Sequence, residues 1–208
     1  MALNTDIVLF ALAFALWSAV HSLTASLGFK ALSRSLVGER LHRAFYRLIY
    51  NLFSLLTFAP VLLLAAVLLS DTLLWSVGPP FSGVFLAIQL LGGIGLAISL
   101  WQTGLWRFVG LRQAVDYFRG PKAAKDEPEL ETGGMYRLVR HPLYFFSLVL
   151  LWFNPVMTWQ TFTFNVAASL YFWLGSILEE RKLEARFGET YRDYRRRVPR
   201  LLPFVGWL

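Results

Sequence analysis

The sequence contains no cysteine and only three histidines among its 208 residues. Without cysteine, the chain can form neither a disulfide bond nor a thiolate metal site. The histidines, His21, His42 and His141, lack the paired spacing of zinc ligands, so we predict no metal site. Acidic residues are also few: the chain has 13 Asp and Glu against 20 Lys and Arg, which gives a net charge of +7. A basic balance of this kind occurs in nucleic-acid-binding proteins and in membrane-facing loops.

Polar residues are too few for an ordinary soluble domain. Hydrophobic residues make up 56% of the chain, whereas soluble domains are about 45–50% apolar. Apolar runs of the length that crosses a bilayer occur at about 7–27, 48–69 and 84–105. The chain is therefore predicted to be an integral membrane protein, and its basic charge is assigned to membrane-facing loops rather than to a nucleic-acid partner.

Two further apolar runs, 142–153 and 156–178, are joined by Asn154-Pro155, which is a turn signal. We predict a membrane hairpin whose two ends return to the same membrane face. The first arm has only twelve residues, fewer than the ~20 that a full span needs. The polar segment 140–144 is therefore expected to lie within the membrane interface, where polar backbone is tolerated if it lines a protein cavity.

Lysine and arginine are absent from the N-terminal segment, from 70–83 and from the Asn154 turn. Five lie between the first two spans, seven in the stretch 106–140 and eight after residue 180. Because cytoplasmic loops carry the excess of basic residues, we predict a bacterial-type inner-membrane protein with its N-terminus outside. The ends of the hairpin and the tail then face the cytoplasm.

The tail carries an apolar stripe at three- and four-residue steps, which predicts an amphipathic helix: Leu183, Phe187, Tyr191, Tyr194 and Val198. The predicted fold is an all-α integral membrane protein with five transmembrane helices, the last two forming the hairpin, plus this cytoplasmic C-terminal helix. We predict one domain over 1–208, with three spans in 1–105 and the long loop, hairpin and tail in 106–208.

The two ends of the hairpin carry polar clusters that have structural and functional interpretations. Arg140-His141-Pro142 suits a helix start with proline at its first position, and Glu179-Glu180 suits a solvated helix end. Ionisable groups at membrane depth are functional candidates, and the hairpin brings the two clusters together, so we predict a site there. His21 and Asn51 suit hydrogen bonds between helices at least as well as a substrate site.

The segments GGMYRLVRHPLY (133–144) and EERKLEARFGETYRDYRRRVPRLLP (179–203) resemble the superfamily of isoprenylcysteine carboxyl methyltransferases and phospholipid methyltransferases. FVGLRQ (108–113) and His21-Ser22 resemble a narrower bacterial branch, which includes the methanethiol S-methyltransferases and NnrU-like proteins. The superfamily motifs cover about the C-terminal half of the chain. The resemblance implies a membrane methyltransferase that uses S-adenosyl-L-methionine.

The resemblance also implies a cofactor pocket over the hairpin, within 106–208. The residues it carries over are Leu130, Gly134, Tyr136, His141, Pro142, Leu143, Tyr144, Glu179 and Glu180, with Gln113 as a looser candidate. Prenylcysteine methyltransferases carry an arginine facing the substrate carboxylate at the position of Gly175. This departure favours a smaller or uncharged acceptor, and Gly175, His21 and Asn51 are the substrate-site candidates.

Methyl transfer from a sulfonium is an in-line displacement that depends on alignment and on a dry pocket. Carboxylates suit the hydroxyl and ammonium groups of the cofactor. A thiol acceptor must lose its proton, and a nearby cation such as Arg140 favours the thiolate. His141 can accept the proton. We therefore predict catalytic roles for Arg140 and His141, and a small or lipophilic acceptor, with a thiol favoured.

Other functions remain as alternatives. The acceptor could be a phospholipid amine or an isoprenylcysteine carboxyl group, and the membrane lipids themselves are expected partners. Sterol-type reductases, which use NADPH, share a similar ending, but the Glu179-Glu180 pair and the short chain with five spans favour the methyltransferase. Nurim-like proteins share the architecture and need no catalysis, and the intact set of Tyr136, His141 and Glu179 argues against that class.

Overall fold

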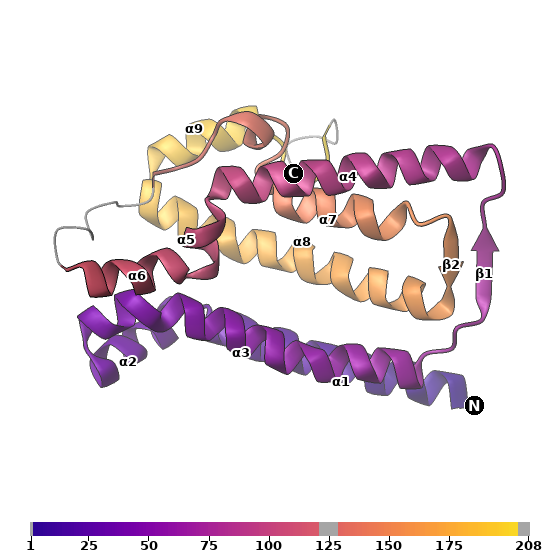
Figure 1. The fold of residues 1–208 in the computed structure, drawn as a ribbon, viewed down its shortest axis with the longest axis horizontal. Helices are drawn as coiled ribbons and strands as arrows, with labels where there is room; N and C mark the ends of the chain where they lie inside the picture. Colours follow the sequence, from indigo (N-terminus) through magenta and orange to yellow (C-terminus); the bar gives the residue numbers. More distant parts are fainter. Residues whose placement is uncertain (1, 121–128, 204–208) are drawn as a thin grey trace. The chain divides into compact units, whose positions relative to one another are not determined.

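The computed structural model describes residues 2–120 and 129–203, with side chains from residue 5 onward (Figure 1). Lys122 and Lys125 of the predicted long loop lie outside the described residues. The chain folds as two units, each assembled from two separate stretches of sequence. The first unit combines Met1–Leu69 with Thr103–Pro128, and the second combines Ser70–Gln102 with Glu129–Leu208.

The first unit is built around one long helix, α3 (Glu39–Leu68), against which the other helices pack. The others are α1 (Ala2–Thr24), α2 (Leu27–Val37), α5 (Leu105–Val109) and α6 (Leu111–Arg119). Rings from α1 and α3 form the contact between the two long helices, with Phe58 4.4 Å from Trp17 and 6.4 Å from Phe14 between centroids. Such aromatic pairs add to the packing energy of the apolar helix faces.

The link between α5 and α6 lies directly against α3, and Gly110 makes this approach possible. Its φ of +98° is in the left-handed region, and a Cβ there would lie 2.5 Å from the backbone nitrogen of Leu48. Asn51 Nδ2 donates hydrogen bonds to the carbonyls of Phe108 and Val109, both over 2.9 Å. These bonds satisfy carbonyl groups at the end of a short helix, which have no partner within the helix itself.

Gly110→Ala is expected to lower the free energy of unfolding by about 2–5 kcal/mol, because left-handed strain adds to a clash with backbone that cannot rotate away. Gly104→Ala is the matched control, since Gly104 is also left-handed, with a φ of +79°, but a Cβ there would meet nothing closer than 3.8 Å. The control is expected to cost only about 1–2 kcal/mol. Chemical unfolding in detergent measures both values, and equal losses would contradict the assigned clash.

The second unit contains a small two-stranded sheet, and each strand directly precedes one of the unit's long helices. Strand β1 (Leu73–Ser76) pairs antiparallel with β2 (Val156–Thr158), with Leu73 opposite Thr158 and Ser76 opposite Val156 (Figure 1). Helix α4 (Phe81–Thr103) follows β1, and α8 (Trp159–Phe187) follows β2. Thr158 caps α8 through a reciprocal capping box with Thr161. The sequence did not predict these strands.

The predicted hairpin is present as α7 (Pro142–Trp152) and α8, joined through the Asn154 turn and β2. Buried polar side chains fix the two arms, since Asn165 Nδ2 donates to the carbonyl of Leu151 over 2.8 Å and Trp152 Nε1 donates to Ser169 Oγ over 2.9 Å. On its other side α7 meets α4, where Gln89 Nε2 donates to the carbonyl of Leu150 over 2.9 Å. Each bond satisfies a polar group in an apolar environment.

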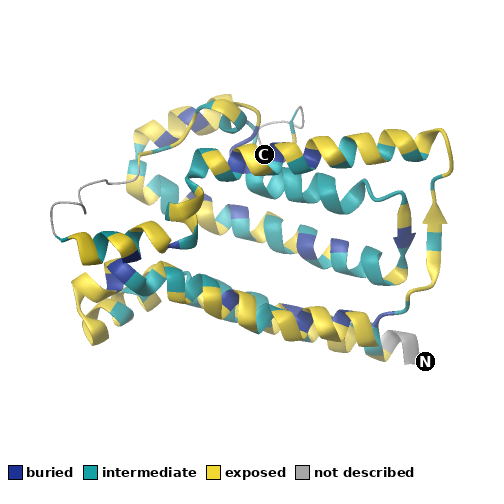
Figure 2. Cartoon of the chain, in the orientation of Figure 1, coloured by how far each residue is buried: buried dark blue, intermediate teal, exposed yellow. Residues whose placement is uncertain are grey.

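Within 2–120 and 129–203, four helices are long and apolar enough to cross a membrane: Thr5–Thr24, Glu39–Leu68, Phe81–Thr103 and Trp159–Phe187. Their surfaces are largely exposed even though they are apolar (Figure 2). The protein is therefore an all-α membrane protein in broad class. Helix α7 has eleven residues, so the count of five spans stays a prediction, as does the orientation inferred from the basic residues.

The tail differs in detail from the prediction. Helix α8 continues without a break through Glu179 and Glu180 as far as Phe187. The chain then bends at Gly188, and the separate helix α9 (Glu189–Arg197) follows. Within the second unit, Tyr191, Tyr194 and Val198 are buried together, with Leu183 and Phe187 packed against them. The predicted apolar stripe is thus shared between the end of α8 and the tail.

Candidate active site

The site is assembled where the chain enters α7, beginning with a short 3₁₀ helix, η2 (Gly134–Arg137). Gly134 has a φ of +51°, and a Cβ there would overlap the side-chain amide of Gln102. That amide accepts a hydrogen bond from the backbone nitrogen of Met135 over 3.0 Å. The hydroxyl of Tyr194 donates to the carbonyl of Tyr136 over 2.6 Å. Helix α4 and the tail therefore fix this turn from two sides.

Arg140 and Glu180 form an ion pair in the interior of the second unit. Arg140 Nε donates to Glu180 Oε1 over 2.7 Å, and the two side chains are 2% and 5% exposed. Arg200 Nε lies 3.3 Å from the other oxygen of Glu180. One buried carboxylate therefore faces two guanidinium groups, which is the compensation that a buried charge requires.

Arg140 also binds the tail through its backbone and its side chain. Its Nη1 donates to the carbonyls of Arg195 and Val198, over 3.0 and 2.5 Å. The backbone nitrogens of Arg140 and His141 donate to the carbonyls of Pro199 and Arg200, over 2.8 and 3.2 Å. The segment that follows α9 is therefore an integral part of the site, held beside the first turn of α7.

Glu179 has a different environment from its neighbour Glu180. The Tyr144 hydroxyl donates to Glu179 Oε2 over 3.0 Å, and the side chain of Glu179 is 48% exposed. The Tyr144 ring lies between the rings of His141 and Phe172, in stacked arrangements with centroids 5.5 and 5.1 Å away. This carboxylate is oriented by a neighbour yet still open to a ligand, so the two adjacent glutamates differ in what they can bind.

His141 lies between the two carboxylates and is itself buried. Its Nδ1 is 3.5 Å from Glu179 Oε2, and its Nε2 is 3.4 Å from Glu180 Oε1. Burial alone lowers the pKa of His141, but the two carboxylates outweigh burial and raise this pKa above its ordinary value. The ring is therefore a proton-binding group placed against the open carboxylate.

The raised pKa makes the contribution of His141 to stability depend on pH. A group that binds its proton more tightly when folded stabilises the fold fully below its ordinary pKa of about 6.5, and this stabilisation is lost as the pH rises through the raised folded value. The difference in melting temperature between wild type and His141→Asn is therefore expected to be largest below about pH 6 and to shrink as the pH rises through the raised pKa of folded His141. A difference that stays constant over this range would contradict the assignment.

The remaining cofactor candidates of the second unit lie close to these groups along the chain. Pro142 and Leu143 form the first turn of α7, and Leu130 and Tyr136 pack against the buried Tyr191, Tyr194 and Val198. At Gly175, a Cβ would lie 3.9 Å from the Tyr144 hydroxyl, so the missing side chain leaves space there. Sequence reasoning missed Gln102, which lies outside both motif segments, and Arg200, which lies within the second of them at 179–203.

The other three predicted residues, Gln113, His21 and Asn51, belong to the first unit. His21 Nδ1 is 2.9 Å from Ser54 Oγ, and its Nε2 is 2.5 Å from the Tyr50 hydroxyl. Gln113 Nε2 donates to the carbonyl of Arg107 over 3.0 Å. These contacts correspond to the structural interpretation of His21 and Asn51, and the predicted substrate and cofactor roles of all three residues stay predictions.

Among the described residues, no group of three or more His, Cys, Asp or Glu side chains is arranged to hold a metal ion. Polar ligation at the site therefore rests on Glu179, His141 and Tyr144. A half-exposed carboxylate with a hydroxyl donor beside it suits a ligand that presents hydroxyl or ammonium hydrogens. This donor set fits the groups of S-adenosyl-L-methionine that the sequence led us to expect.

Comparison with known proteins gives one family and a set of similar enzymes. Residues 3–198 match the family described as "Protein of unknown function (DUF1295)". The chain is 33% identical to the methanethiol S-methyltransferase of Mycobacterium tuberculosis, over 88% of this chain and 72% of that protein. It is 31% identical to methanethiol S-methyltransferase 1 of Bradyrhizobium diazoefficiens, over 93% of this chain. The chain spans 65% of the length of that second relative. No solved structure matches the chain.

Proposed function

The chain belongs to the DUF1295 family, and on that premise we propose that it is a membrane methyltransferase that uses S-adenosyl-L-methionine to methylate a small thiol. Two relatives that are 30% and 33% identical, in Crocosphaera subtropica and Mycobacterium tuberculosis, are named methanethiol S-methyltransferase. The observation that carries the proposal is the contrast within Glu179-Glu180, where one carboxylate is 48% exposed and the other 5%. The buried carboxylate of Glu180 holds the site together through its ion pairs, and the half-exposed carboxylate of Glu179 is available to the cofactor.

In the proposed complex, Glu179 accepts hydrogen bonds from hydroxyl or ammonium groups of the cofactor. S-adenosyl-L-methionine, when bound, supplies a methyl group activated by a positively charged sulfur. Tyr144 keeps the Glu179 carboxylate in place through its hydroxyl. Leu130, Gly134, Tyr136, Pro142 and Leu143 are proposed to form the remaining wall. Gly175 leaves space beside Tyr144 for an acceptor that carries no carboxylate.

His141 is proposed to promote loss of the proton from the acceptor thiol. In its neutral form the imidazole can take the thiol proton, and in its charged form it favours the thiolate. The catalytic role predicted for Arg140 stays a prediction. Its 2% exposure and its bonds to Glu180 and to tail carbonyls favour a positioning role, in which the guanidinium keeps His141 and the tail in register.

The test uses the full chain purified in detergent, with methyl-labelled S-adenosyl-L-methionine. Methanethiol, a prenylcysteine analogue and phosphatidylethanolamine are offered as separate acceptors, and Glu179→Ala is the control. Label is expected in the thiol product and not in the control reaction. Label in the lipid amine or in the carboxyl group of the prenylcysteine analogue would show that the acceptor is not a small thiol. Protection of the protein by NADPH alone would indicate a reductase, and failure to bind either cofactor would indicate a non-catalytic protein.

A further inference from the structure

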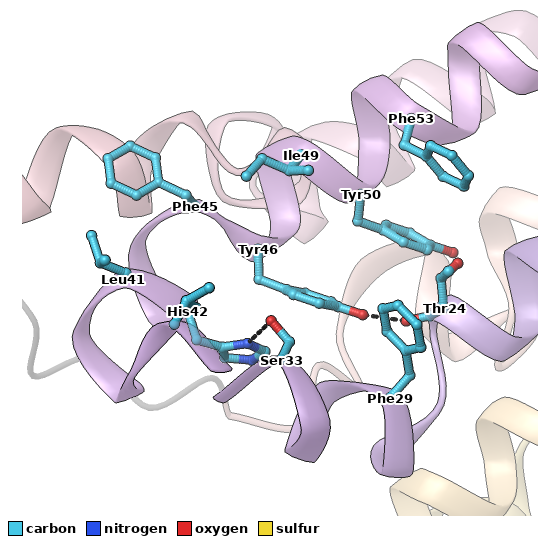
Figure 3. A pocket seen from close by; sticks show the side chains of 11 residues that line it. Thr24, Phe29, Ser33, Leu41, His42, Phe45, Tyr46, Ile49, Tyr50 and Phe53 are labelled. Atoms are coloured by element: carbon cyan, nitrogen blue, oxygen red, sulfur yellow. Dashed lines mark hydrogen bonds between the residues drawn. The ribbon is translucent and has the colours of Figure 1, made fainter. Parts of the chain in front are cut away.

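The first unit contains a cavity of about 510 Å³ between α2 and the N-terminal half of α3 (Figure 3). Its volume is within the range of about 300–1,000 Å³ that is typical of small-molecule sites. Five of the side chains that line it are Phe or Tyr: Phe29, Phe45, Tyr46, Tyr50 and Phe53. Nothing in the proposed methyl transfer uses this cavity.

The tyrosines of the wall present their rings to the cavity, because their hydroxyls are engaged elsewhere. The Tyr46 hydroxyl donates to the carbonyl of Thr24 (Figure 3). The Tyr50 hydroxyl is 2.5 Å from His21 Nε2. Beyond these, Ser33 and His42 supply polar side chains that are bonded to each other over 3.0 Å. The cavity therefore suits a hydrocarbon chain and offers little to a polar molecule.

Cations border the cavity on α2. Lys30 and Arg34 directly follow the lining residues Phe29 and Ser33, and both are close enough to His42 to act on it electrostatically. Between residues 27 and 47 the chain holds five Lys and Arg but a single acidic residue, Glu39. Glu39 pairs with Arg43 over 2.5 Å and lies 3.8 Å from Arg34 in an exposed contact, so the excess of positive charge persists.

Helix α2 has the character of a helix that lies along a membrane surface. It connects two candidate spans and contains no buried residue (Figure 2). Leu27, Leu32 and Leu36 are exposed on it. Of its two cations, Arg34 is exposed and Lys30 is half-buried. Amphipathic helices with this composition place their apolar face against acyl chains and their cations against headgroups. If α2 lies along the membrane surface, the cavity beside it lies at the depth where a lipid changes from acyl chain to headgroup.

We propose that this cavity is a binding site for one anionic phospholipid of the surrounding bilayer. One acyl chain lies among the five aromatic side chains, and the phosphate headgroup lies against Lys30 and Arg34. The charge of the headgroup distinguishes this lipid from a zwitterionic one, since juxtamembrane cations attract anionic headgroups.

The full chain in non-ionic detergent is titrated with phosphatidylglycerol or with phosphatidylcholine of the same acyl chains, and bound lipids are counted by native mass spectrometry. One phosphatidylglycerol is expected to bind more tightly than phosphatidylcholine. Removal of both cations in a Lys30→Gln/Arg34→Gln variant is expected to weaken its binding by about fivefold per charge. An Arg112→Gln/Arg119→Gln variant, which removes two charges from α6, is expected to retain the preference.

The acyl-chain part of the site has its own pair of variants. Leu41 lines the cavity and is 44% exposed, so Leu41→Trp fills the cavity without entering a packed core. Leu36 is 75% exposed and does not line the cavity, so Leu36→Trp is the control. The first variant is expected to lose the tightly bound lipid, and the second is expected to keep it.

A measurement on the unaltered protein covers the case in which Leu41→Trp fails to fold. Phosphatidylglycerol with a photoreactive acyl chain is expected to label peptides from residues 24–53. The proposal would be overturned by equal binding of the two lipids or by labelling confined to other segments. It would also be overturned if Leu41→Trp displaced a second copy of the chain instead of a lipid.

Discussion

Glu179→Gln is expected to weaken binding of S-adenosyl-L-methionine by about 10- to 100-fold, because a hydrogen bond to a charged group contributes roughly 1.5–3 kcal/mol. The carboxylate is half exposed, accepts a hydrogen bond from the Tyr144 hydroxyl and lies 3.5 Å from His141 Nδ1, so its charge contributes to stability mainly when His141 is protonated. The melting temperature is therefore expected to fall at low pH, where His141 is protonated, and to change little at high pH, where it is neutral. Equilibrium binding of labelled cofactor to the purified variant measures the effect directly.

Glu184→Gln is the matched control for this prediction. Glu184 lies on the same helix, five residues later, and pairs with Arg192 over 2.9 Å at the surface. Surface ion pairs contribute about 0–1 kcal/mol, so this variant is expected to bind the cofactor as the wild type does. If both variants lost binding equally, the loss would reflect the total charge of the protein, and the role of Glu179 would be rejected.

Glu180→Ala is expected to have the opposite profile, with a loss of about 3–5 kcal/mol in the free energy of unfolding, because it leaves buried guanidinium charge without its counter-ion. Arg140 is 2% exposed and Arg200 is 17% exposed, so neither can readily exchange the carboxylate for water. Activity would be lost together with the fold. Chemical unfolding in detergent, monitored by the helical signal, measures the change.

A double variant separates the ion pair from general damage to the core. Replacing a buried pair by apolar side chains of similar size is often neutral, so Arg140→Met/Glu180→Leu is expected to be more stable than Glu180→Ala alone. The apolar pair cannot bond to the carbonyls of Arg195 and Val198, so part of the loss is expected to remain. A double variant with the summed loss of its two single variants would show that the residues act independently.

The sequence correctly predicts the hairpin and the proximity of the polar residues at its two ends. Asn154-Pro155 indicates the turn, and the apolar runs on either side of it become α7 and α8. The structure places His141 and Tyr144 beside Glu179 and Glu180, as a hairpin requires. The resemblance to the methyltransferase superfamily, and to its bacterial branch, is confirmed by the relatives named methanethiol S-methyltransferase.

The sequence could not distinguish the two glutamates or predict the sheet. Glu179 and Glu180 are identical residues at adjacent positions, and only the packing of the tail determines which one is buried. Strands β1 and β2 have four and three residues and no long alternating pattern, so no period could reveal them. Arg200 is one of eight basic residues after Glu180, and its sequence position alone does not indicate that it contacts Glu180.

The resemblance also gave Gln113 a possible cofactor role that the local structure does not require. Within its own unit, Gln113 donates to the carbonyl of Arg107, and Gly110 and Asn51 fix the same turn. A motif can therefore recur because a turn must dock on a helix, in addition to any ligand that it binds.

The contacts between Arg140, Glu180 and the segment around Arg200 also determine when the site can form during synthesis. Twenty residues separate Glu180 from Arg200, and a ribosome that adds 5–20 residues per second needs about 1–4 s to make them. During that interval both hairpin arms exist, but the tail carbonyls and the second guanidinium do not. Before Arg200 is made, Glu180 can pair with Arg140 but lacks its second guanidinium, so this part of the site is completed only once residue 200 has been added.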